Sequence, residues 1–163
     1  MQISGRIVLK VAPNHAISAL HDRITLERFL LGASRLQEIG PAQFSFAIQR
    51  KVAVVTLNLP GTLSVTPVKE GRIYRFDAKA AHLIGGSAQL TLDITFDAIA
   101  DGTNLAWDGT LDSTGLARNV LKEKEGRIGS LVRQIMEDFK DRVQKEATIA
   151  AQAAIVAKPA RQG

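Results

Sequence analysis

The sequence predicts an α+β domain in which an antiparallel sheet with one apolar face is covered by a long C-terminal helix. Three observations lead to this prediction. Residues 87–97 alternate polar and apolar side chains, as a strand with one wet face and one dry face does. Short, turn-like connections separate the successive strand patterns, which favours antiparallel pairing. After residue 114 the spacing of apolar residues changes from period two to that of a helix.

The composition indicates one soluble globular domain. The chain has 163 residues, of which 45% are hydrophobic and 23% charged, and its formal net charge is +5. It has no cysteine, which excludes disulfides, thiolate metal sites and a cysteine nucleophile and suits a reducing cytoplasm. Neither a secretory signal nor an apolar run of about 20 residues is seen. The cations form no cluster interleaved with aromatics, so we expect no nucleic-acid binding. We expect a cytoplasmic location.

The N-terminal part of the chain predicts one strand followed by two short helices. Residues 3–11 alternate and form the first strand. Pro13 suits the first turn of a helix, where its missing N–H would have no partner. The second helix is expected from about Thr25 to Leu31, ending at Gly32.

From Ser34 the pattern returns to period two and predicts a run of strands. Turns are expected at Gly40-Pro41, Glu70-Gly71 and Asp101-Gly102. Pro60-Gly61 has two interpretations: it is the tip of a hairpin, or it lies within a strand whose turn falls near residues 53–54. The two interpretations differ in the register of that strand.

The last predicted element is a helix that begins after Ser113 or Thr114, either of which can cap it. It should run from about Leu116 to beyond Val143 with one apolar stripe, and it is long enough to cover the dry face of the sheet. We expect the domain to span residues 1–146 and an alanine-rich, frayed tail to span residues 147–163.

Two glycines inside this helix are unusual. Gly126 and Gly129 should each cost about 1 kcal/mol of helix stability relative to alanine. A helix tolerates this where something approaches its backbone closely. The sequence leaves open whether a strand or a ligand does so.

The order of elements resembles the START-like helix-grip superfamily, which includes polyketide cyclase-like proteins. Four local stretches add to this resemblance: MQISGRIVLKVAPNHAISALHD, LLGASRLQEIGPAQF, GGSAQLTLD and LVRQIMEDF. They are similar to the CoxG-like family of carbon monoxide dehydrogenase proteins, and the likeness covers nearly the whole chain to about residue 143. The resemblance places Pro60-Gly61 within a strand and so implies seven strands. The chain departs from the family at Leu30-Leu31-Gly32, where Ile-Pro-Gly is common, and at Glu123 and Lys124, where apolar residues are usual.

The resemblance implies a cavity between sheet and helix that takes a hydrophobic small molecule, a lipid or a quinone. It also implies an accessory role beside a molybdenum hydroxylase of the carbon monoxide dehydrogenase type, with peripheral contact to the inner face of the membrane. We expect no cofactor and no catalysis. The alternative is a polyketide cyclase-like or hydrolase-like enzyme that acts on a hydrophobic substrate in the same cavity.

The residues expected to line this cavity lie on the dry faces of the strands and along the helix. Lys124 has two interpretations: its amine meets a ligand carbonyl or acid, or its stem covers the core while the amine reaches water, which is the commoner outcome. The apolar residues fit a ligand pocket and a plain packed core equally well. The expected ligand-binding residues are Phe44, Phe46, Tyr74, Phe76, Leu92, Trp107, Leu116, Val120, Lys124 and Ile128.

Other polar residues are interpreted as surface groups. His15, His21 and His82 have no metal-ligand spacing, so surface or loop positions are favoured over a metal site. Asp93 and Asp97 share the polar face of their strand and should be solvated. A buried pair of catalytic carboxylates would need the opposite face.

Overall fold

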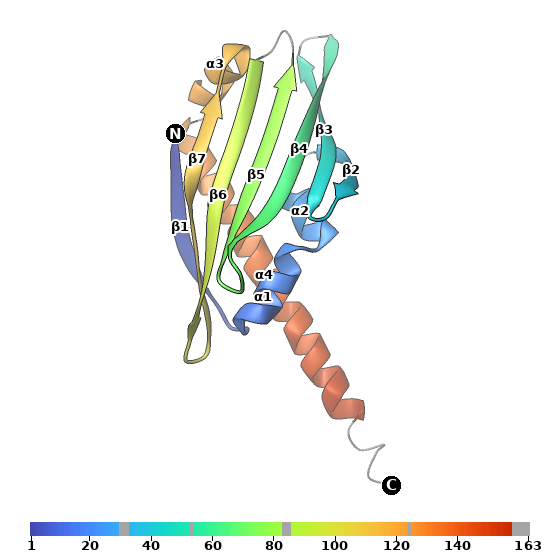
Figure 1. Ribbon diagram of the computed structural model, residues 1–163, viewed down its shortest axis with the longest axis vertical. Coiled ribbons are helices and arrows are strands. Elements are labelled where there is room, and N and C mark those ends of the chain that lie inside the picture. The colour runs from blue at the N-terminus through green and yellow to red at the C-terminus, as the bar shows by residue number, and fades with distance from the viewer. Residues whose placement is uncertain (30–32, 53, 83–85, 124, 158–163) are drawn as a thin grey trace.

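The computed structural model describes residues 1–29, 33–52, 54–82, 86–123 and 125–157 (Figure 1). The predicted stop of the second helix at Gly32 lies outside these residues. The elements are β1 (Gln2–Leu9), α1 (Pro13–Leu20), α2 (Arg23–Phe29), β2 (Ala33–Gly40), β3 (Gln43–Val52), β4 (Val55–Lys69), β5 (Ile73–His82), β6 (Gly86–Ile99), β7 (Gly102–Ser113), α3 (Gly115–Glu123) and α4 (Glu125–Ala157).

The strands of the described chain form one antiparallel sheet of seven strands in the order β1-β7-β6-β5-β4-β3-β2. Strands β2 to β7 follow one another through short connections, and β1 completes the sheet by pairing with β7. The helices α1 and α2 connect the two edge strands, β1 and β2. The prediction of a seven-stranded antiparallel sheet with a long C-terminal helix is confirmed.

The position of Pro60-Gly61 within a strand is also confirmed. Both residues belong to β4, and the hairpin turn falls where Val52 pairs with Val55. Gly61 lies directly opposite Phe46 in the register. A Cβ atom at Gly61 would lie 2.3 Å from Phe46 Cζ, so the missing side chain makes room for the phenyl ring.

The strands separate a wet face from a dry face as predicted. Asp93 and Asp97 lie on the outer face, where Arg75 donates to Asp93 at 2.8 and 3.0 Å and Arg72 donates to Asp97 at 2.7 Å. This hydrogen bond from the guanidinium to Asp93 raises the pKa of Arg75 above its ordinary value. Both carboxylates are therefore solvated surface groups, and Ile94 and Phe96, which alternate with them on β6, face the core.

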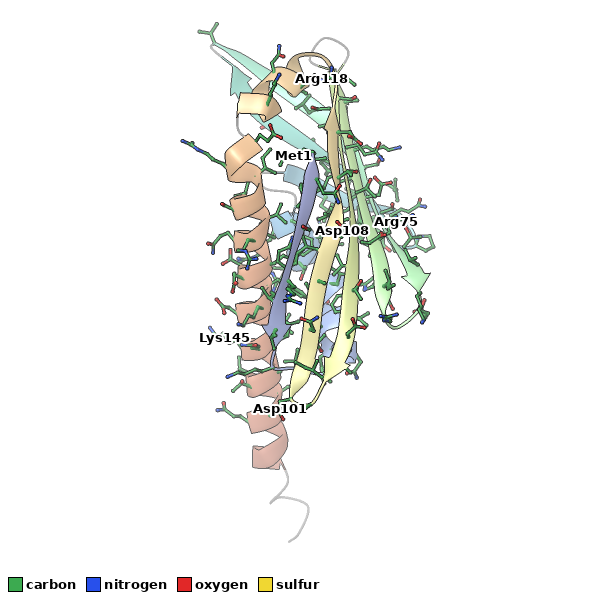
Figure 2. All side chains as sticks on the ribbon, turned by 90° about the vertical axis from the view of Figure 1, so that its left-hand side faces the viewer. Met1, Arg75, Asp101, Asp108, Arg118 and Lys145 are labelled. Carbon is green, nitrogen blue, oxygen red and sulfur yellow. The ribbon has the colours of Figure 1, made fainter. Side chains whose placement is uncertain are left out.

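Helix α4 covers the dry face of the sheet. Figure 2 shows it running along the strands from the end of the sheet near Arg118 and continuing beyond Lys145. Its buried residues recur at helical spacing and join the buried residues of the sheet in one core. They are Val132, Met136, Phe139 and Val143.

Helices α3 and α4 together occupy the span of the helix that the sequence predicted from about Leu116 to beyond Val143. The Thr114 hydroxyl is bound to β6, since Oγ1 accepts from Ser87 N at 3.1 Å and is 2.8 Å from Ser87 Oγ. Gly126 and Gly129 lower the helix propensity of the first turns of α4. The position between the helices, residue 124, lies outside the described residues.

The last described residues belong to α4, which continues to Ala157. The expected boundary between residues 146 and 147 stays a prediction. Among the described residues, none of the helices combines the length and the hydropathy that crossing a bilayer requires.

Two buried threonines attach the short helices to the rest of the fold. Thr103 Oγ1 donates to the Val11 carbonyl at 2.7 Å, which holds the end of β1 against β7. Arg142 of α4 donates to Thr25 Oγ1 and so ties α4 to α2. Burial lowers the pKa of the Arg142 guanidinium from its ordinary value. These bonds fix α2 in place over the sheet, next to the cavity described below.

Candidate ligand-binding cavity

Part of the predicted cavity lining is a filled aromatic core. Phe76 is 1% exposed and packs edge-to-face on Phe29 of α2, with ring centroids 5.6 Å apart. Phe29 in turn contacts Phe139 of α4 at 6.1 Å, so three elements meet through these rings. Leu92 is buried in the same cluster. The structure therefore brings Phe76 and Leu92 together, but as parts of a packed interior.

Tyr74 and Trp107 are also buried, and each already has a polar or cationic neighbour. The Tyr74 hydroxyl accepts from Gly71 N at 3.0 Å and donates to Glu70 Oε1 at 3.3 Å, which places it in the β4–β5 turn. The Trp107 ring lies over Gly5 of β1. The Arg133 guanidinium lies 5.8 Å from the centroid of the Trp107 ring. Neither Tyr74 nor Trp107 is among the residues that line the cavity described below.

The remaining predicted lining residues have different surroundings. Phe46 is buried over Gly61, as described above. Phe44 and Ile128 are half-buried and pack against the core from its edge. Leu116 and Val120 belong to α3, but their side chains lie outside the described part of the structure, as does Lys124 altogether.

A cavity of about 310 Å³ lies between α2 and the dry face of strands β2 to β4. We call it the α2 cavity. Its floor is apolar, and its rim carries the ionisable side chains His21, Arg23 and Glu38, which are all exposed. It is lined by His21, Arg23, Leu26, Leu36, Glu38, Ala42, Phe44 and Val65.

The walls of the α2 cavity follow from the local structure. Leu26 lies on the buried side of α2, and Leu36 is buried at an irregularity in the β2–β3 pairing. Arg23 joins these walls, because its guanidinium donates to the Leu36 carbonyl at 2.5 Å and pairs with Glu27 at 3.0 Å. Phe44 and Val65 contribute from the dry face of the sheet.

A second, larger pocket of about 570 Å³ lies at the α3 end of the sheet. Its lining is mainly polar and exposed and includes Asp112, Arg118, Lys122 and Glu125. It lacks the buried apolar floor of the α2 cavity. A hydrophobic ligand would gain little there, since burial of apolar area is its main source of binding free energy.

The two helix glycines have open space around them. No atom of the described structure outside the helix's own backbone lies within 4 Å of a Cβ built at Gly126 or at Gly129. Within the described part of the chain, no strand therefore lies in contact with these two positions. The interpretation that a ligand approaches them stays a prediction.

From the sequence, His21 is expected at the surface. Of the residues that line the α2 cavity, only Phe44 is among the expected ligand-binding residues. The signal that could have found them is weak. Leu26 and Leu36 appear as ordinary core positions, and the irregular register that turns Leu36 inward is visible only in the paired strands. Folding brings His21 to the rim because it ends α1 just before α2 begins.

Comparisons with known proteins place the fold. No protein-family profile and no curated protein matches the sequence. A conserved protein from Geobacillus kaustophilus is similar in structure with a TM-score of 0.70, at 21% identity over 92% of this chain and 97% of that one. The di-domain ARO/CYC StfQ from the steffimycin biosynthetic pathway has a TM-score of 0.60, at 11% identity over 90% of this chain and 52% of its own.

The protein Ara h 8.0201 is also similar, with a TM-score of 0.51 and 12% identity over 89% of this chain and 98% of that one. Identities this low establish the fold alone. The chain therefore has the START-like helix-grip fold, with its seven-stranded sheet around a long C-terminal helix.

Proposed function

We propose that this protein binds a compact hydrophobic molecule in the α2 cavity. The observation that carries the proposal is a space of about 310 Å³ backed by the buried side chains of Leu26, Leu36 and Val65. An apolar floor with a few polar groups at the rim is typical of small-molecule sites. The volume is at the lower end of the range for such sites, roughly 300–1,000 Å³.

We propose a binding role without catalysis. Acid–base chemistry needs polar groups that converge on a substrate and are free to exchange a proton. Every buried side-chain nitrogen or oxygen in the described residues has a hydrogen-bond partner. The Tyr74 hydroxyl, in particular, is bound within the β4–β5 turn. The alternative, a polyketide cyclase-like or hydrolase-like enzyme, is supported by the fold similarity to StfQ alone.

The accessory role is a further part of the proposal. The sequence resemblance supports a lipid or quinone as ligand and a molybdenum hydroxylase of the carbon monoxide dehydrogenase type as partner. Its first test is co-purification: tagged protein from the native host should retain the hydroxylase polypeptides. A tagged protein that elutes without them under gentle conditions would contradict this part and leave the ligand site intact.

The side chains exposed at one end of the molecule support a peripheral contact with the membrane. Helix α3 and the β3–β4 turn lie at the same end of the sheet (Figure 1). Val54 in that turn is 93% exposed, and Arg118 and Lys122 are exposed on α3. An exposed apolar tip and exposed cations at the same end of the molecule suit a surface of anionic lipids.

Vesicle flotation tests this contact. We expect the protein to float with vesicles that contain phosphatidylserine, and Val54→Asp to abolish flotation. The matched control is Val68→Asp, since Val68 is 52% exposed near the opposite end of β4. Equal loss in both variants, or flotation on neutral vesicles alone, would contradict the assignment of this end.

The binding proposal is tested with a fluorescent probe without formal charge, N-phenyl-1-naphthylamine. We expect saturable binding that weakens roughly tenfold in Phe44→Ala, because losing a half-buried ring removes about 1–1.5 kcal/mol of contact. Leu90→Ala is the matched control, since Leu90 is also half-buried on the dry face but lies three strands from β3. A probe that binds both variants equally would contradict the proposed location.

A further inference from the structure

The rim of the α2 cavity collects polar side chains from three different elements. His21 follows α1, Arg23 begins α2 and Glu38 lies on β2. Glu38 pairs directly with Phe44 in the register, so its carboxylate is on the same face of the sheet as the cavity floor. A ligand that buries an apolar body against Leu26 and Val65 therefore presents its polar end to these three groups.

The hydrogen bond of His21 determines what its ring offers. His21 Nδ1 lies 2.8 Å from the Ile17 carbonyl oxygen. A carbonyl oxygen only accepts, so Nδ1 carries the hydrogen and donates it. In the neutral ring the other nitrogen, Nε2, is then an acceptor. The ring orientation is further held by an edge-to-face contact with Tyr74, whose ring centroid is 5.4 Å away.

The charges of the rim disfavour an anionic ligand. The Arg23 guanidinium is already paired with Glu27 and donates to the Leu36 carbonyl. Glu38 adds the carboxylate of the lining. With a neutral imidazole, a ligand carboxylate would meet the negative charge of Glu38, while the one cation of the lining, Arg23, is already paired. Two acceptors, His21 Nε2 and the Glu38 carboxylate, remain for a ligand that donates.

We infer that the α2 cavity selects compact apolar ligands that carry a hydroxyl group, of the phenol or alcohol class, over carboxylates and over ethers of the same shape. The hydroxyl donates to His21 Nε2 or to Glu38 while the ring lies on the apolar floor. This inference rests on the proposed function and specifies the ligand class of that same site. Of the two ligands that the sequence resemblance implies, a lipid with a hydroxyl group fits this rim, whereas a quinone, whose carbonyl oxygens only accept, does not.

Three naphthalenes of one shape test the selection: 2-naphthol, 2-methoxynaphthalene and 2-naphthoate. Their affinities for the full chain are measured by isothermal titration at one salt concentration. One or two hydrogen bonds should favour 2-naphthol over the ether by roughly 3- to 30-fold. The carboxylate should bind more weakly than the naphthol.

Variants assign this preference to named atoms. In His21→Asn the side-chain amide can still donate to the Ile17 carbonyl, but no atom occupies the position of the His21 Nε2 atom. In His21→Gln the longer side chain places its amide group at the position of Nε2. We expect the naphthol preference to fall severalfold in His21→Asn and to be partly retained in His21→Gln. Glu38→Gln should reduce the discrimination against 2-naphthoate. His15→Asn is the matched control, since His15 is exposed on the same helix.

The outcomes separate the two proposals. If 2-naphthol and the ether bind the unmodified protein equally, the hydroxyl inference is overturned while the cavity stands. If the naphthol preference survives both His21→Asn and Glu38→Gln, the selecting groups lie elsewhere and the inference is wrong. If none of the three compounds and no N-phenyl-1-naphthylamine binds, the proposed function itself is overturned.

Discussion

The contact between Gly5 and Trp107 provides a quantitative test of the packing. The two residues are directly opposite each other in the β1–β7 register. A Cβ atom at Gly5 would lie 2.2, 2.6 and 2.9 Å from three atoms of the Trp107 ring. Ordinary contacts between carbon atoms are about 3.5–4.0 Å, so Gly5→Ala requires the ring to move by roughly 1 Å or more. Trp107 is 2% exposed and belongs to the buried core, so its ring can move only if its neighbours also shift.

The expected magnitude follows from this overlap. Overpacking of a filled core costs about 1–3 kcal/mol, so Gly5→Ala should lower the free energy of unfolding by that amount. For a chain of this size, each kcal/mol corresponds to roughly 2–4 °C in Tm. In a Trp107→Leu background the overlapping ring atoms are gone. Gly5→Ala should then be neutral or stabilise by up to about 1 kcal/mol, because alanine restricts the unfolded chain.

A double-mutant cycle measures the coupling between the two positions. Urea unfolding is followed by far-UV circular dichroism, because the chain has one Trp and its fluorescence is lost in the Trp107→Leu background. We expect a coupling of about 1–3 kcal/mol. Equal effects of Gly5→Ala in both backgrounds would refute the claim that the indole ring occupies the space above Gly5.

Two further predictions concern single positions. Thr103→Val should lower the free energy of urea unfolding by about 1–3 kcal/mol, because it leaves the buried Val11 carbonyl without its donor. An unchanged unfolding midpoint would contradict a stabilising role for this hydrogen bond. Gly129→Ala should stabilise the protein by about 1 kcal/mol, since open space surrounds that position, and a loss of stability would show that it is packed.

The sequence predicted the strands well because their burial alternates cleanly. On β6 the side chains of Leu92, Ile94 and Phe96 are buried while Asp93 and Asp97 face water, and the period of two reports this directly. The turn at Val52–Val55 was harder, since Pro60-Gly61 has the composition of a turn. Pro60-Gly61 nevertheless lies within β4, where the missing side chain of Gly61 makes room for the Phe46 ring. Only the paired strands reveal this contact.

The candidate site was predicted less well, for a physical reason. Apolar periodicity identifies residues that avoid water, but it does not distinguish a residue that fills the core from one that borders a cavity. Phe44 and Phe76 have the same pattern in the sequence; Phe76 packs on Phe29, while Phe44 lines the α2 cavity. His21 is exposed, as the sequence indicates, but its neighbours at the rim, Leu36 and Glu38, come from β2 and are not apparent from its own sequence context.

The most direct test of the binding site is a methyl NMR titration of the full chain with N-phenyl-1-naphthylamine. We expect the methyl signals of Leu26, Leu36 and Val65 to shift, since these side chains form the floor of the α2 cavity. The methyls of Ile94 and Leu105, which lie in the filled core, should stay in place. Shifts centred on Ile94 and Leu105, with Leu26, Leu36 and Val65 unchanged, would contradict the assignment of the ligand to the α2 cavity.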